Sequence, residues 1–225
     1  IHLEKPLSFR EKKMLERAAV EALGHLGDFR AVNPVLQALR QGGRKIKDVA
    51  SVSLVELYNR FSQDQKTKLI CRIREVYGKD ISIYLISSLE DENEQIKMAA
   101  IKILGWMAET KAIKGLLKCF DDQTQDEIIV ALVNMKGEAI EPLMTELPKV
   151  SDRLREVIAR VFGEIGDRKA VGSLAHFLSD PDGHVRQAAS IALGKIKDPL
   201  AIRSLLQEAS PARPGRNWRP PCRRR

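Results

Sequence analysis

The chain contains few residues that could build a covalent or metal-linked framework. Its 225 residues include 3 cysteines and 4 histidines, and none of them has the spacing of a zinc site or a disulfide framework. No apolar run reaches the ~18 residues that span a membrane, and no signal peptide is visible. We therefore expect a cytoplasmic protein that uses no cofactor and does not insert into membranes.

Catalytic motifs are missing as well. The sequence has no glycine-rich phosphate loop and no nucleophile elbow. Its densest acidic run, Glu90–Glu94, is typical of a solvated turn before a helix, whereas acid–base catalysis needs carboxylates in a concave, desolvated place. These absences favour a non-enzymatic protein over an enzyme.

The period-two alternation that marks half-buried strands is also absent. Apolar residues instead recur at spacings of three and four, and the pattern repeats along the chain: Val161–Leu174 is echoed in register by Ala192–Leu205. Equivalent positions of successive units are Ala31, Ile81, Ala112, Ala139, Ala170 and Ala201. Self-similarity at such a period indicates stacked units, so we predict an all-α fold, an α-solenoid of antiparallel helix pairs.

Small residues mark the second helix of each predicted pair. Four glycines lie near the ends of these helices: Gly24, Gly105, Gly163 and Gly194. A glycine there either relieves crowding between helices or helps the chain leave the helix.

The longest interval between equivalent positions, from Ala31 to Ile81, contains an insertion. Within it, Ser62–Gln65 has the residues of a capping box, and apolar side chains follow at helical spacing. The sequence therefore predicts an extra helix at about 63–77. We assign residues 1–209 to the solenoid and expect it to be truncated at both ends, because its first and last helices lack their pair partners.

Residues 210–225 do not follow the repeat. They contain six of the chain's arginines and no acid, so removing them leaves 32 basic and 30 acidic side chains of the original 38 and 30. A basic arm for nucleic acid or membranes is one interpretation. Their order resembles a translated polylinker, so we interpret this Pro/Arg tail as vector-derived and expect it to be disordered.

The segment Asp180–Gly194 combines an acid in a turn with a Val-Arg dipeptide in the following helix. It resembles the HEAT repeat, in the short form also found in phycobilisome lyases. That resemblance implies a ladder of acids and bases between neighbouring units. Asp180 and Arg186 match both ladder positions, and Asp91 and Lys97 match them with a conservative change. HEAT-like hydroxylases hold two irons with His-Glu motifs, which this sequence lacks.

One unit departs from the repeat on its second helix. Met98, Lys102 and Trp106 are spaced i, i+4, i+8 and share a face, and Arg160 has the place of Lys102 in another unit. The resemblance implies that second helices line the concave side, so these four residues are candidates for binding a partner, with Trp106 as an aromatic anchor. In the alternative, the inserted helix packs over this face and buries it.

These patterns favour a protein–protein interaction scaffold that binds another protein, or another domain of its parent chain, on the concave face. A bilin lyase or chaperone-like subunit is an alternative that rests on the resemblance alone. A nucleic-acid binder is a further alternative, suggested by a column of bases: Lys47, Lys97, Arg155 and Arg186. The nearly neutral body of the chain makes nucleic acid the weaker choice.

The last predicted helix, 199–208, has an apolar stripe formed by Ile202, Leu205 and Leu206. In a solenoid such a stripe packs against the second helix of its own unit. Uncovered apolar ends of repeat stacks tend to associate. We therefore predict end-to-end self-association through this helix.

Overall fold

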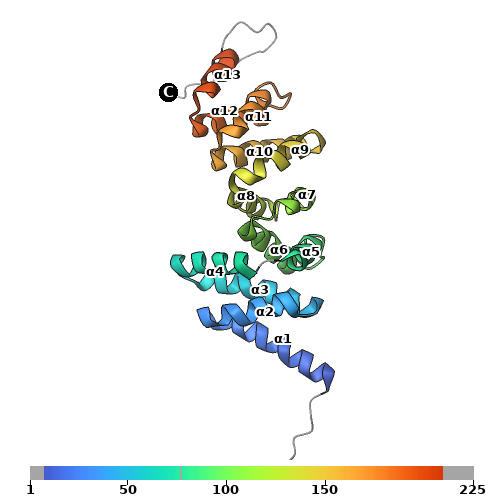
Figure 1. Ribbon diagram of the computed structural model, residues 1–225. Coiled ribbons are helices and arrows are strands. Elements are labelled where there is room, and N and C mark those ends of the chain that lie inside the picture. The colour runs from blue at the N-terminus through green and yellow to red at the C-terminus, as the bar shows by residue number, and fades with distance from the viewer. Residues whose placement is uncertain (1–7, 77, 210–225) are drawn as a thin grey trace, which may run out of the picture. The chain divides into compact units, whose positions relative to one another are not determined.

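The protein is described by a computed structural model that covers residues 8–76 and 78–209 (Figure 1). Within these ranges every regular element is a helix, which confirms the predicted all-α fold. The α-helices are α1 (Phe9–Leu26), α2 (Val32–Gln41), α3 (Arg44–Arg60), α4 (Gln63–Val76), α5 (Lys79–Ser88), α6 (Glu94–Met107), α7 (Ile113–Lys118), α8 (Gln125–Asn134), α9 (Ile140–Glu146), α10 (Asp152–Ile165), α11 (Val171–Phe177), α12 (Gly183–Ile196) and α13 (Pro199–Ala209). Residues 210–225, the predicted disordered tail, lie outside the described residues.

The chain divides into two compact units, residues 1–150 and 151–225, which we call the N-terminal and C-terminal units and describe separately. In the N-terminal unit the second helices α1, α3, α6 and α8 pack side by side in that order, and the first helices α2, α5 and α7 each pack against one of them. In the C-terminal unit α12 packs along α10 and also contacts α11 and α13. Each unit is thus built of stacked helix pairs.

The spacing of apolar residues places the core between first and second helices. In α2, the side chains of Val35, Leu36 and Leu39 are at most 2% exposed. In α12, Ala188 and Ala189 are buried, and their short side chains let the neighbouring backbones approach. First and second helices both supply bulky core groups, and the small residues of α12 let it pack closely against its neighbours.

At three crossings of second helices, a glycine faces a small residue of the next helix. A Cβ placed on Gly163 would lie 2.8 Å from both Cα and Cβ of Ala192, closer than real Cβ contacts allow. The pairs in this relation are Gly24–Ser53, Gly105–Ala131 and Gly163–Ala192. Crowding therefore explains three of the four predicted glycines. Gly194 differs, because no described atom lies within 4 Å of a Cβ placed there.

Helix α4 occupies the segment in which the sequence predicts an inserted helix. Its N-terminus has a capping box: the Gln65 side chain accepts a hydrogen bond from Ser62 N at 3.1 Å, and Gln65 N donates to Ser62 Oγ at 3.5 Å. Leu69 and Ile73 are buried, where α4 packs against α6, α3 and α2. The inserted helix is thus part of the core of the N-terminal unit.

Candidate functional site

Trp106 is a core residue and not an exposed anchor. Its side chain is 4% exposed, and its ring stacks on Tyr58 of α3 with centroids 4.3 Å apart. Arg74 of the inserted helix α4 donates from Nε to the Trp106 carbonyl oxygen at 2.7 Å. The structure thus corrects the prediction of an exposed aromatic and agrees with the alternative, in which the insertion covers this face.

The other three candidate residues do not form one site with Trp106. Met98 is half-buried on α6, and Lys102 makes an ion pair across to Glu127 of α8, with 3.7 Å between Nζ and Oε1. Arg160 lies on α10, in the C-terminal unit, and is exposed. Arg160 lines a groove of the C-terminal unit, and Met98 lines a smaller pocket of the N-terminal unit.

The acid–base ladder is present with partly different bases. Asp180 accepts a hydrogen bond from Arg155 Nε at 2.8 Å, and this bond raises the pKa of the arginine. Arg186 instead donates to the backbone carbonyls of Asp180 and Pro181, both at 2.8 Å. Asp180 therefore joins its own turn to the preceding second helix, as the resemblance implies.

In the N-terminal unit, Asp91 pairs with Arg44, with 3.3 Å between Nη2 and Oδ2. Lys47, on the same helix as Arg44, lies over the ring of Tyr84, with its Nζ 5.5 Å from the centroid. Lys97 lies near the turn of the next pair, where its charge helps to lower the pKa of Asp121 after the hydrogen bonds from Thr124 and Gln123. Its predicted partner Asp91 is bound by Arg44.

These contacts bear on the nucleic-acid alternative. Lys47 and Arg155 contact groups of the chain itself, and Arg186 is hydrogen-bonded to its own turn. A phosphate-binding stripe needs cations that are free to face solvent. The column therefore serves the ladder and the turns.

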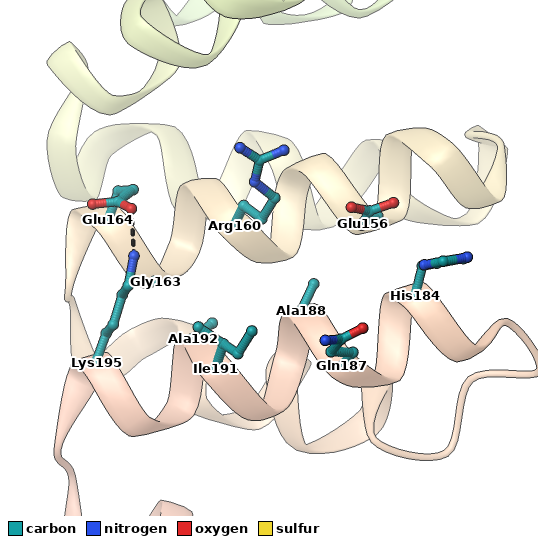
Figure 2. A pocket seen from close by; sticks show the side chains of 10 residues that line it. All are labelled: Glu156, Arg160, Gly163, Glu164, His184, Gln187, Ala188, Ile191, Ala192 and Lys195. Atoms are coloured by element: carbon teal, nitrogen blue, oxygen red, sulfur yellow. Dashed lines mark hydrogen bonds and ion pairs between the residues drawn. The ribbon is translucent and has the colours of Figure 1, made fainter. Parts of the chain in front are cut away.

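The C-terminal unit has a groove between α10 and α12, with a volume of ~340 Å³ (Figure 2). The close contact of Gly163 with Ala192 forms part of its lining. At one end the Lys195 ammonium group donates to Glu164 at 2.5 Å. Glu156 and His184 lie at the opposite end.

The middle of this groove combines charge with apolar surface. Arg160 projects from α10, and Ile191 on α12 is 55% exposed. The groove thus offers one exposed branched side chain between charged groups.

The N-terminal unit has a corresponding groove of ~330 Å³ between α1 and α3, with the start of α6 at its edge. Val49 and Val52 supply its apolar lining. His25 Nδ1 lies 3.1 Å from Glu56 Oε2, at the place that the Lys195–Glu164 pair has in the C-terminal groove. The two grooves therefore share one register relative to their glycine contacts.

The charge order of the two grooves is reversed. On α10, Glu156 precedes Arg160 by one turn. On α1, Arg17 lies as far before Gly24 as Glu156 lies before Gly163. Glu21 likewise has the position that corresponds to Arg160. A partner segment that suits one groove thus meets the opposite charges in the other.

The residue directly after each of the four glycines is polar in three units and is Trp106 in the fourth. The column after the glycines contains His25, Glu164 and Lys195, all of which line the grooves. The available signal was the pairing of opposite charges across neighbouring second helices. It is visible only once the helix register is known.

Across 8–76 and 78–209, no three His, Cys, Asp or Glu side chains are grouped so that they could hold a metal ion. Burial raises the pKa of Tyr84 to about 12 and that of Cys119 to about 11, but neither residue lines a groove. No helix in the described part combines the length and the apolar character needed to cross a bilayer.

Known proteins resemble this chain in sequence and in fold. The family described as HEAT repeats matches residues 140–217, and the PBS lyase HEAT-like repeat matches residues 15–41. Phycocyanobilin lyase subunit alpha from Nostoc sp. is 37% identical over 79 residues, a match that covers 32% of this chain and 29% of the relative's length.

Solved structures share the fold at low sequence identity. An archaeal HEAT-like repeats protein from Thermococcus onnurineus has a TM-score of 0.50 and 19% identity, covering 86% of this chain and 82% of that one. An engineered protein has a TM-score of 0.53 and 18% identity, covering 87% and 58%. At these identities the likeness shows the α-solenoid fold alone.

Proposed function

We propose that this chain, a HEAT-repeat protein with repeats of the phycobilisome-lyase type, is a scaffold that binds another protein along its second-helix grooves. The observation that supports the proposal is the repetition of one groove design in both units. Each groove has a glycine contact, a contact between a basic and an acidic side chain at one end, and an exposed or half-buried branched residue. Repeat proteins use such extended surfaces for recognition.

The chemistry of the grooves favours a peptide segment over a small molecule. Small-molecule sites are usually enclosed and mostly apolar, with a few convergent polar groups. Here the polar groups alternate in sign along the helix, as with Glu156, Arg160 and Glu164. A helix or extended segment with alternating charges and one apolar side chain against Ile191 matches this pattern.

A photo-crosslinking experiment tests the proposal. A crosslinking amino acid replaces either Ile191, in the groove, or Ile83 on α5, which is 66% exposed and outside both grooves. In cells of the source organism we expect position 191 to give a discrete adduct with a protein other than this chain, and position 83 to give none. Equal labelling from both positions would overturn the proposal.

A charge variant makes the result specific. Arg160→Glu reverses the charge in the middle of the C-terminal groove and should abolish the adduct from position 191. Lys169→Glu, on an exposed site of the same unit outside the groove, makes the same charge change and should leave the adduct intact. Both variants should melt within a degree or two of the parent, since both side chains are exposed.

A second candidate function is that of a bilin lyase subunit. The observation that favours it is the 37% identity to phycocyanobilin lyase subunit alpha over 79 residues. On this proposal the chain binds phycocyanobilin and a phycobiliprotein, and transfer of the chromophore follows. Incubation with both should then give a covalently coloured phycobiliprotein. Unchanged absorbance of the separated protein would remove this candidate and leave the scaffold proposal intact.

A further inference from the structure

Exposed apolar side chains concentrate on the first and last helices of the described residues. Of the eleven large hydrophobic residues that are exposed, four belong to α1 and four to α12 and α13. Those of α1 are Phe9, Met14, Leu15 and Leu26, and those of α12 and α13 are Ile191, Leu200, Ile202 and Leu206. Eight of the eleven therefore lie on only three of the described helices.

The outer face of α12 repeats the face of α10 that α12 itself packs against. Gly194 has the place of Gly163, and Ile191 has the place of Arg160. Gly163 contacts Ala192, whereas nothing in the described residues lies within 4 Å of a Cβ on Gly194. The α12 face thus has the shape that receives a second helix, and it is more apolar than the α10 face.

The outer face of α1 repeats the face that α12 turns toward α10. In α12, Ala188 and Ala192 line the contact with α10 and are at most 6% exposed. Their counterparts on α1, counted from the glycine of each helix, are Ala18 and Ala22, and both are exposed. The α1 face is therefore a helix surface of the kind that fits against a glycine such as Gly194.

The last helix completes this correspondence. Helix α13 packs on α11 and α12, with Ala201 buried at 2% exposure, as first helices do. Ile202 and Leu206 on its other side are 57% and 65% exposed. In a complete helix pair, apolar side chains of this kind on the first helix pack against the second helix. Among residues 8–76 and 78–209 no second helix is seated there.

We propose that α12 and α13 of one copy of this chain bind α1 of a second copy, head to tail. Ala22 of the second copy lies against Gly194, as Ala192 lies against Gly163 within one chain. Leu15 and Ala19 of that copy then face the stripe of α13, so that α13 and α1 form a complete helix pair. The contact continues the register of the α10–α12 interface, and it is heterologous because two different faces meet.

The test uses two variants of the full chain that disturb opposite faces without burying a charge in the monomer. Gly194→Glu fills open space on α12, and Ala22→Glu adds a side chain to an exposed position on α1. Gly172→Glu is the matched control, since Gly172 is a helical glycine of α11 with nothing within 4 Å. Circular dichroism and melting should show all three variants folded.

Sedimentation velocity then gives distinct outcomes. The parent chain and the control should increase in mass with concentration, while each face variant alone should stay at 25.3 kDa. An equimolar mixture of the two face variants should form a two-chain species, because each supplies one intact face. A parent chain that stays monomeric, a mixture that does not pair, or self-association of Ala22→Glu alone would each overturn the proposal. None of these results bears on Arg160, so the proposed function is tested separately.

Discussion

Gly163 lies directly against Ala192, and a single methyl group on the glycine would collide with the backbone of the facing helix. A Cβ there would lie 2.8 Å from both Cα and Cβ of Ala192. The contact sets how closely α10 and α12 approach and thereby shapes the groove beside them.

Gly163→Ala should therefore destabilise the chain by about 1–3 kcal/mol, the usual cost of overpacking a core contact. Gly194→Ala should instead stabilise it by up to ~1 kcal/mol, because alanine is the better helix former and the site is open. Chemical denaturation of the two variants measures the difference. Equal effects would mean that the helices do not meet at Gly163.

Trp106→Ala should destabilise the N-terminal unit by about 3–5 kcal/mol, as expected for a buried tryptophan. The loss includes the stacking on Tyr58. Lys102→Ala is the control on the same helix, and it should cost less than ~1 kcal/mol, since its ion pair with Glu127 is partly exposed. A melting temperature that Trp106→Ala leaves unchanged would contradict the burial.

Arg155→Ala should lower the free energy of unfolding more than Arg44→Ala, although each variant removes one ion pair of the ladder. The Asp180 side chain is 8% exposed and bonded at 2.8 Å, whereas Asp91 is 18% exposed and its arginine 64% exposed. We expect a loss of ~1.5–3 kcal/mol for Arg155→Ala, as for a hydrogen bond to a charged group. For Arg44→Ala we expect below ~1 kcal/mol. Urea unfolding with both variants tests this order.

The Cys119 thiol should resist alkylation near neutral pH. Burial raises its pKa from the ordinary 9.0 to about 11, and the thiolate is the reactive form. At pH 8 iodoacetamide should therefore label exposed Cys71 well before Cys119, as peptide mass mapping will show. Equal rates would contradict the burial of Cys119.

The same shift predicts an alkaline loss of stability. A raised folded-state pKa means that the folded chain keeps a proton that the unfolded chain releases, so the free energy of unfolding falls as pH rises from about 9 to 11. Cys119→Ala should flatten the decline in this window, which urea titrations at several pH values measure. An unaltered slope would show that Cys119 does not contribute.

Much of the fold follows from local sequence. The helix periodicity and the capping box at Ser62 each depend on residues close together in the chain, whereas the crowding at the glycines joins residues of two helices. The burial of Trp106 could not be predicted with the same certainty, because it depends on Tyr58 and on Arg74, which come from two other helices. Tertiary contacts of this kind have no signature in one sequence segment.

The candidate site was predicted in part. Arg160, a sequence candidate for partner binding, lines the C-terminal groove, whereas its neighbours Ile191 and His184 were not among the candidates. Likewise, Asp91 pairs with Arg44 and not with Lys97. Both differences depend on which side chains of adjacent helices touch each other. A repeat pattern in the sequence predicts these contacts only to within about one helical turn.

The most direct test of the scaffold proposal swaps the two charged residues of one ion pair. In the double variant Glu164→Lys with Lys195→Glu, the ion pair across the C-terminal groove is kept in reversed order, so the melting temperature should not change. The affinity for the protein crosslinked from position 191, measured by calorimetry, should fall at least about tenfold, or ~1.4 kcal/mol. Unchanged affinity, with the fold intact, would contradict the assignment of the groove as the binding surface.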